Sequence, residues 1–173
     1  WSFYFKGGYM EKSKVYFTDM RTNYENSMLK KFKDLLIKSG INNIDFKDKF
    51  VALKIHFGEY GNLAFIKPNY VKVIVDIIKE KGGIPFLTDA STLYSGSRSD
   101  AVHHLITAEL NGFNSMTTGC PIVIADGLKG DDYKEIDVNL KHCKTVKIGT
   151  VIMDADISVS YTHLAGDSQM TLP

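Results

Sequence analysis

Apolar residues recur along the chain in two different periods, which alternate from one end to the other. Short β-rich runs predict strands at residues 14–18, 50–57, 84–88 and 121–125. Apolar residues at helical spacing predict helices from about residue 26 to 38, from Pro68 to the glycine pair at 82–83, and from about 99 to 110. Near the end, "EIDVNL", "KTVKIG" and "ISVSY" predict shorter strands around a one-turn segment, "VIMDAD".

This alternation indicates how the strands are joined. Strand–helix–strand units with connections of this length form right-handed crossovers, which place consecutive strands parallel to one another. Helices then cover the sheet that these strands build. We therefore expect an α/β fold, a Rossmann-like three-layer sandwich with a mainly parallel sheet.

The two ends of the chain differ from its middle. The first residues, "WSFYFKGGYM", lack an initiator methionine, whereas Met10 followed by "EKSKVYF" is typical of a natural start. The last stretch, "SYTHLAGDSQMTLP", has no periodicity. We expect a non-native leader at 1–9, an α/β domain at 10–160, and a tail at 161–173 that is non-native or truncated. The chain is then a fragment, truncated at its C-terminus.

Composition narrows the class of protein. The formal net charge of +1, with acids and bases interspersed, predicts neither a nucleic-acid partner nor an anionic membrane surface. No apolar run reaches the roughly 18–20 residues needed to span a bilayer. Two cysteines far apart in the sequence, Cys120 and Cys143, form no disulfide framework and favour a reducing cytoplasm.

Ionisable residues follow the predicted strands. In open parallel sheets, ligands bind beyond the carboxyl ends of the strands. The four strand ends carry Thr18-Asp19, Lys54-Ile55-His56, Thr88-Asp89 and Asp126-Gly127. These groups are expected to converge on one edge of the sheet. The alternative is that each aspartate caps the helix or turn that follows it.

The second strand carries the strongest signal. Side chains alternate along a strand, so Lys54 and His56 share one face, roughly 7 Å apart. A buried ammonium is costly unless it is paired, and this cost disappears if the strand end opens into a ligand cleft. Glu59 and Asn62 then supply an acceptor and an amide. The alternative is an ion pair between Lys54 and Glu59, with His56 hydrogen-bonded in the wall.

The loop "TDASTLYSGSR", residues 88–98, is the second unusual segment. Its hydroxyls and backbone amides precede a helix N-terminus and are of the kind that hold an anion. Arg98 adds a bidentate fork. The alternative is a polar surface loop in which Arg98 pairs with Asp100. His103 and His104 point about 100° apart on the next helix and are expected to be partly exposed rather than metal ligands.

Several long motifs resemble one family. "KIHFGEYGN", "PFLTDASTLYSGSR", "GCPIVIADGLKGDD" and "DADISVS" are similar to domain of unknown function family 362, often described as uncharacterised iron–sulfur centre proteins. The resemblance covers about residues 13–160. It implies a ferredoxin-type domain elsewhere in the parent protein, whose four cysteines hold a [4Fe–4S] cluster. After "ISVS" the chain departs from the family pattern: His163 is the only remnant, and no cysteine cluster follows.

We therefore expect the N-terminal ligand-binding domain of an iron–sulfur redox or electron-transfer protein, with no cofactor and no metal ligands in this chain. Its partners would be a small anionic ligand and the ferredoxin-type domain. The expected catalytic residues are Lys54, His56 and Asp89. The expected ligand-binding residues are Glu59, Asn62, Thr92, Tyr94, Arg98 and Asp126. Two alternatives stay open. One is a non-redox enzyme acting on a small hydroxy-acid or phosphorylated substrate, with His56 as general acid/base. The other is a scaffold that docks the ferredoxin-type domain.

Overall fold

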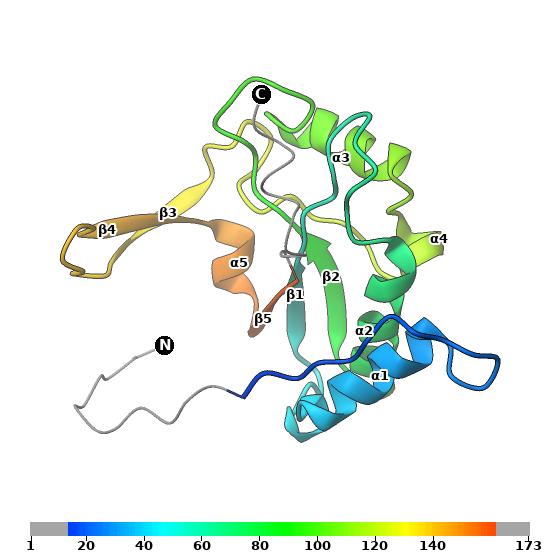
Figure 1. Ribbon diagram of the computed structural model, residues 1–173. Coiled ribbons are helices and arrows are strands. Elements are labelled where there is room, and N and C mark those ends of the chain that lie inside the picture. The colour runs from blue at the N-terminus through cyan, green and yellow to red at the C-terminus, as the bar shows by residue number, and fades with distance from the viewer. Residues whose placement is uncertain (1–13, 162–173) are drawn as a thin grey trace. The chain divides into compact units, whose positions relative to one another are not determined.

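The computed structural model describes residues 14–161 (Figure 1). The chain divides into two compact units, Trp1–Asn42 and Asn43–Pro173, which we describe separately. The leader predicted at 1–9 lies outside the described residues, as does the predicted tail from residue 162 onward.

The first unit contains one long helix and an extended segment before it. Helix α1 (Met28–Lys38) begins after Ser27, whose hydroxyl accepts the N–H of Lys30 as an N-cap. The strand predicted at 14–18 is wrong, because this segment has no regular secondary structure. The side chains of Val15 and Phe17 are 90% and 84% exposed. A β-rich composition makes a strand only where a neighbouring strand supplies backbone partners.

A three-stranded parallel sheet forms the centre of the second unit, in the order β2-β1-β5 (Figure 1). Its strands are β1 (Phe50–Lys54), β2 (Ile84–Thr88) and β5 (Ile157–Ser160). Strand β1 pairs with β2 from Phe50↔Ile84 to Lys54↔Thr88 and with β5 from Val51↔Ile157 to Lys54↔Ser160. As the central strand it is buried on both faces, which explains its nearly continuous apolar run.

The segment predicted as a strand at 121–125 lies beside β2 but is not a regular strand. Only Ile122 forms a bridge, parallel to Leu87. Three backbone hydrogen bonds of 2.9 Å nevertheless follow the edge of β2: Leu87 N–H to Pro121 O, Val123 N–H to Leu87 O, and Ala125 N–H to Asp89 O. Pro121 has no N–H to contribute, which limits the ladder at this end. The predicted neighbour and direction are correct, and the predicted regularity is not.

Helices flank this sheet. Helix α2 (Pro68–Glu80) starts with a proline at its first turn and buries one apolar stripe. The buried residues of that stripe are Val71, Ile74, Val75, Ile77 and Ile78. Helix α3 (Ala101–Leu110) begins at Asp100, whose carboxylate accepts the N–H of His103. This mixed α/β arrangement, a parallel sheet flanked by helices, confirms the predicted Rossmann-like fold.

The remaining elements are short. They are η1 (Ile41–Asn43), α4 (Ser115–Thr118), β3 (Tyr133–Asp137), β4 (Thr145–Gly149) and α5 (Thr150–Asp154). Strands β3 and β4 pair antiparallel as a separate two-stranded sheet. Helix α4 is absent from the sequence prediction, although its N-cap Asn114 accepts the N–H groups of Met116 and Thr117 in a capping box.

Candidate functional site

The carboxyl ends of β1 and β2 lie side by side, because the two strands are parallel and Lys54 is in register with Thr88. The loops that follow them therefore leave the same edge of the sheet. One loop carries His56 and Glu59, and the other carries Asp89 and the segment that leads to Arg98. The structure brings the side chains of these loops together.

Asp89 is the centre of this charged cluster. Its Oδ1 lies 3.0 Å from the Lys54 ammonium and accepts the N–H of Ala90 at 3.0 Å. Its Oδ2 accepts a hydrogen bond from Arg98 Nη1 at 3.3 Å. The Asp89 side chain is 6% exposed, so its charge is held almost entirely by protein partners. The sequence left open an ion pair between Lys54 and Glu59; in the structure the partner of Lys54 is Asp89.

Glu59 is bound to the opposite side of the Arg98 guanidinium. Its Oε1 accepts hydrogen bonds from Arg98 Nε at 2.9 Å, from Arg98 Nη2, and from the Tyr94 hydroxyl at 2.7 Å. Burial alone would raise the pKa of Glu59, but the hydrogen bonds from Arg98 and Tyr94 outweigh burial and lower it. Arg98 therefore pairs with Glu59 and Asp89, and not with Asp100, which caps α3.

His56 is half-buried, and one of its ring nitrogens is already used. The backbone N–H of Gly58 donates to His56 Nδ1 at 2.9 Å. A nitrogen that accepts a hydrogen bond carries no proton, so the neutral ring keeps its proton on Nε2. Burial lowers the pKa of His56, and the positive charge of Arg98 lowers it further. His56 is thus a neutral hydrogen-bond donor through Nε2.

The environment of His104 differs from the sequence prediction. The sequence predicted partly exposed histidines on this helix, but His104 is fully buried, and its Nε2 lies 3.7 Å from Asp89 Oδ2. Neither ring nitrogen has a hydrogen-bond partner within residues 14–161. Burial lowers the pKa of His104 to about 4. The available signal was helical spacing, because Thr107 and Ala108, three and four positions later, are buried on the same face.

The other predicted residues have local roles. Asp126 accepts the N–H and the hydroxyl of Ser91, which ties the loop after residue 125 to the loop after β2. Asn62 Oδ1 accepts the N–H of Ala64, and Thr92 Oγ1 donates to the carbonyl of Tyr94. These three residues shape the loops around the charged cluster.

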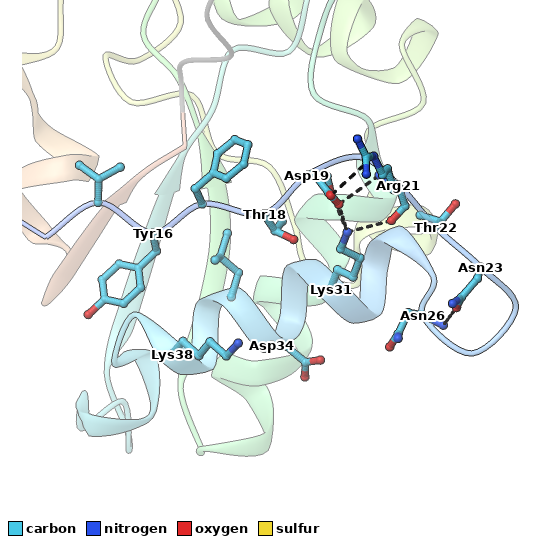
Figure 2. A pocket seen from close by; sticks show the side chains of 13 residues that line it. Tyr16, Thr18, Asp19, Arg21, Thr22, Asn23, Asn26, Lys31, Asp34 and Lys38 are labelled. Carbon is cyan, nitrogen blue, oxygen red and sulfur yellow. Dashed lines mark hydrogen bonds and ion pairs between the residues drawn. The ribbon is translucent and has the colours of Figure 1, made fainter.

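The first unit contains a cavity of about 610 Å³ between its extended segment and α1 (Figure 2). Figure 2 shows the Lys31 side chain reaching the segment, where it donates to the Asp19 carboxylate and to the carbonyls of Asp19 and Arg21. The sequence predicted Asp19 at the end of a strand. Instead, Asp19 is held by Lys31, whose hydrogen bond lowers the pKa of the Asp19 carboxyl.

A second hollow of about 630 Å³ lies in the other unit, among apolar residues such as Phe50, Ile84 and Val123. Neither hollow is lined by one of the residues predicted to be catalytic or ligand-binding.

The two cysteines of the chain are both free thiols. Cys120 is buried, and burial raises the pKa of its thiol to about 11. Cys143 donates through Sγ to the carbonyl of Thr145 at 3.0 Å. No group of three or more His, Cys, Asp or Glu side chains within residues 14–161 could hold a metal ion.

None of the helices described between residues 14 and 161 combines the length and apolar character that crossing a bilayer requires.

Comparison with known proteins gives one positive result. No curated protein and no solved structure matches the chain. The profile of one protein family matches residues 51–172, which is more than half of the chain and includes the whole charged cluster. The chain therefore belongs to the family described as Domain of unknown function (DUF362).

Proposed function

We propose that this domain binds a small anion at the carboxyl edge of the parallel sheet, with Lys54 and His56 as its direct contacts. The observation that carries the proposal is the pair of donors on one face of β1 and its continuation. The side chain of Lys54 is 35% exposed, and the neutral ring of His56 offers Nε2–H. The Asp89 carboxylate holds Lys54, and the Gly58 N–H holds the His56 ring.

Lys54 has hydrogen-bonding capacity to spare. An ammonium has three N–H donors, and within residues 14–161 the partner of Lys54 is Asp89 Oδ1. It can therefore keep its bond to Asp89 while it donates to a bound anion. Asp89 in turn keeps Arg98 and the Ala90 N–H as partners, so ligand binding leaves no buried carboxylate unpaired.

Arg98 has a supporting role in this proposal. Its side chain is 5% exposed, and four of its five N–H groups are directed at Glu59, Asp89 and Tyr94. A guanidinium bound in this way cannot also clamp a ligand. It holds the loops after β1 and β2 together, and so fixes the position of His56 relative to Lys54.

The state of His56 favours binding over acid–base catalysis. Protonation of Nδ1 would break the hydrogen bond from Gly58, and the pKa of His56 is already lowered by burial and by Arg98. A general acid/base works best with a pKa near the working pH. A neutral imidazole with a fixed Nε2–H instead suits the stabilisation of a ligand oxygen. The alternative of an enzyme with His56 as general acid/base has less support.

The wider role rests on the family resemblance. We propose that the ligand site serves a larger iron–sulfur redox protein, in which a separate ferredoxin-type domain carries the cluster. This chain alone does not fit a [4Fe–4S] cluster, because it has two cysteines where four thiolates are needed. Sequencing the gene downstream of this segment tests the point. A CxxCxxCxxxCP run supports the iron–sulfur parent, and its absence contradicts it.

Anion binding is tested by titrating the isotope-labelled chain with small carboxylates and phosphates while amide chemical shifts are followed. We expect saturable shifts at Lys54, His56 and Gly58, and their loss in Lys54→Met. Lys72→Met is the matched control, because Lys72 pairs with Asp76 on the surface of α2. Equal binding by both variants would contradict the proposed site.

A further inference from the structure

The charges and the hydrogen-bond donors of the cluster indicate which class of anion it binds. We infer that the ligand of the Lys54–His56 site is a small monocarboxylate and not a phosphate ester. This inference rests on the proposed function. The ligand class follows from the groups of the site that are still available to an anion.

The charges of the cluster limit which anions it can accept. The cluster contains two cations, Lys54 and Arg98, and two anions, Glu59 and Asp89, so these charges cancel. His56 adds none, because its pKa is lowered. Asp126, 8% exposed and bonded to Ser91, adds a further negative charge nearby. The charges named here sum to −1, so the dianion of a phosphate monoester is repelled more strongly than a monoanion that binds close to Lys54.

The backbone amides of the two loops also bear on the ligand class. Phosphate sites are typically built from several loop N–H groups that point at the ligand. Here four N–H groups of the two loops are taken by the protein itself. Those of Gly58, Ala90, Ser91 and Thr92 bind His56 Nδ1, Asp89 Oδ1, the Asp126 carboxylate and the Arg98 carbonyl, respectively. The first three amides after Asp89 are therefore not available to cradle a phosphate.

The hydrogen-bond donors that remain for a ligand belong to two side chains. Within residues 14–161, Asp89 is the partner of the Lys54 ammonium, which leaves further N–H groups for a ligand, and His56 keeps Nε2–H. These two side chains leave one face of the same chain segment, two residues apart and roughly 7 Å between their Cα atoms. A carboxylate has two oxygens, one for each donor, and a charge of one. The match in charge and in donor number favours a carboxylate.

The decisive experiment compares two probes of similar size, propionate and methyl phosphate. Both are titrated into the labelled chain at constant ionic strength and at about pH 8, where the phosphate monoester is a dianion. We expect propionate to bind at least about tenfold more tightly than methyl phosphate. Lys54→Met should weaken propionate binding about tenfold or more, since a charge-assisted hydrogen bond is lost. His56→Phe should weaken it as well, and Lys72→Met should leave it unchanged.

The outcomes test the monocarboxylate assignment and the existence of the anion site separately. If methyl phosphate binds as tightly as propionate or more tightly, and Lys54→Met abolishes this binding, the monocarboxylate assignment is overturned and the anion site stands. If neither probe shifts the amides of Lys54, His56 and Gly58, both proposals fail. Amide spectra of each variant without ligand establish that it is folded. If Lys54→Met proves to be unfolded, binding by His56→Phe tests the site in its place.

Discussion

Replacing Arg98 with methionine measures how much of the fold depends on the charged cluster. The substitution keeps an unbranched side chain but removes the guanidinium that joins Glu59 to Asp89. Breaking a buried ion pair by removing one partner costs about 3–5 kcal/mol. Asp89 keeps Lys54 and the Ala90 N–H, and Glu59 keeps Tyr94 and is 20% exposed, so we expect the lower end, about 3 kcal/mol. For a chain of this length that is a fall in melting temperature of about 10 °C.

The assay is urea unfolding followed by circular dichroism, with a thermal melt alongside. Arg21→Met is the matched control, because Arg21 is the other arginine in the chain, is 94% exposed and lies 4.0 Å from Asp19. It should cost less than about 0.5 kcal/mol. Arg98→Lys should fall between wild type and Arg98→Met, since lysine restores charge but not the planar fork. If Arg98→Met changes the free energy of unfolding by less than about 1 kcal/mol, the cluster is not a buried, paired network and the reasoning above is wrong.

Three further predictions concern pH, a tight turn and iron. The folded-state pKa of His104, about 4, lies below its ordinary value of 6.5, so the unfolded chain binds more protons between these values. The free energy of unfolding should therefore fall as pH is lowered from 6.5 to 4, and pH-dependent urea unfolding of His104→Gln should show a shallower fall. Gly58→Ala should destabilise by about 1–3 kcal/mol more than Gly61→Ala in the same assay. Both glycines have positive φ, but only at Gly58 would a Cβ meet Asn111 and Phe65 within 3 Å; equal losses would contradict this packing. Iron analysis after anaerobic reconstitution should find no stoichiometric cluster, because two cysteines cannot supply four thiolates; one cluster per chain would refute this.

The sequence predicted the parts of the fold that hydrophobic periodicity controls. Strands β1 and β2 and helix α2 carry strong patterns because each buries a continuous apolar surface. The strand predicted at 14–18 failed for the opposite reason. Its composition is β-rich, but pairing depends on a partner elsewhere in the chain, and composition contains no information about that partner.

The candidate site shows the same division. Topology was enough to predict that Lys54, Glu59, Asp89 and Arg98 would meet, because parallel strands bring their carboxyl ends to one edge. Topology could not assign the pairs: Lys54 binds Asp89, whereas Glu59 binds Arg98. Those choices depend on loop conformation at the scale of single ångströms. The helical angle between His103 and His104 separates their side chains but does not say which of the two faces the core; the buried Thr107 and Ala108 mark that face.

The position of β1 between β2 and β5 has a consequence during synthesis of the protein. Phe50, the first residue of β1, binds the side chain of Asp156 just before β5, and these residues are 106 positions apart. At typical translation rates about 5 to 20 s pass between the synthesis of these two segments. Throughout that interval one edge of a strongly apolar strand has unsatisfied backbone groups on the ribosome, where it can pair with another nascent chain. We expect the yield of this protein to depend on how well chaperones cover that edge until β5 has been synthesised.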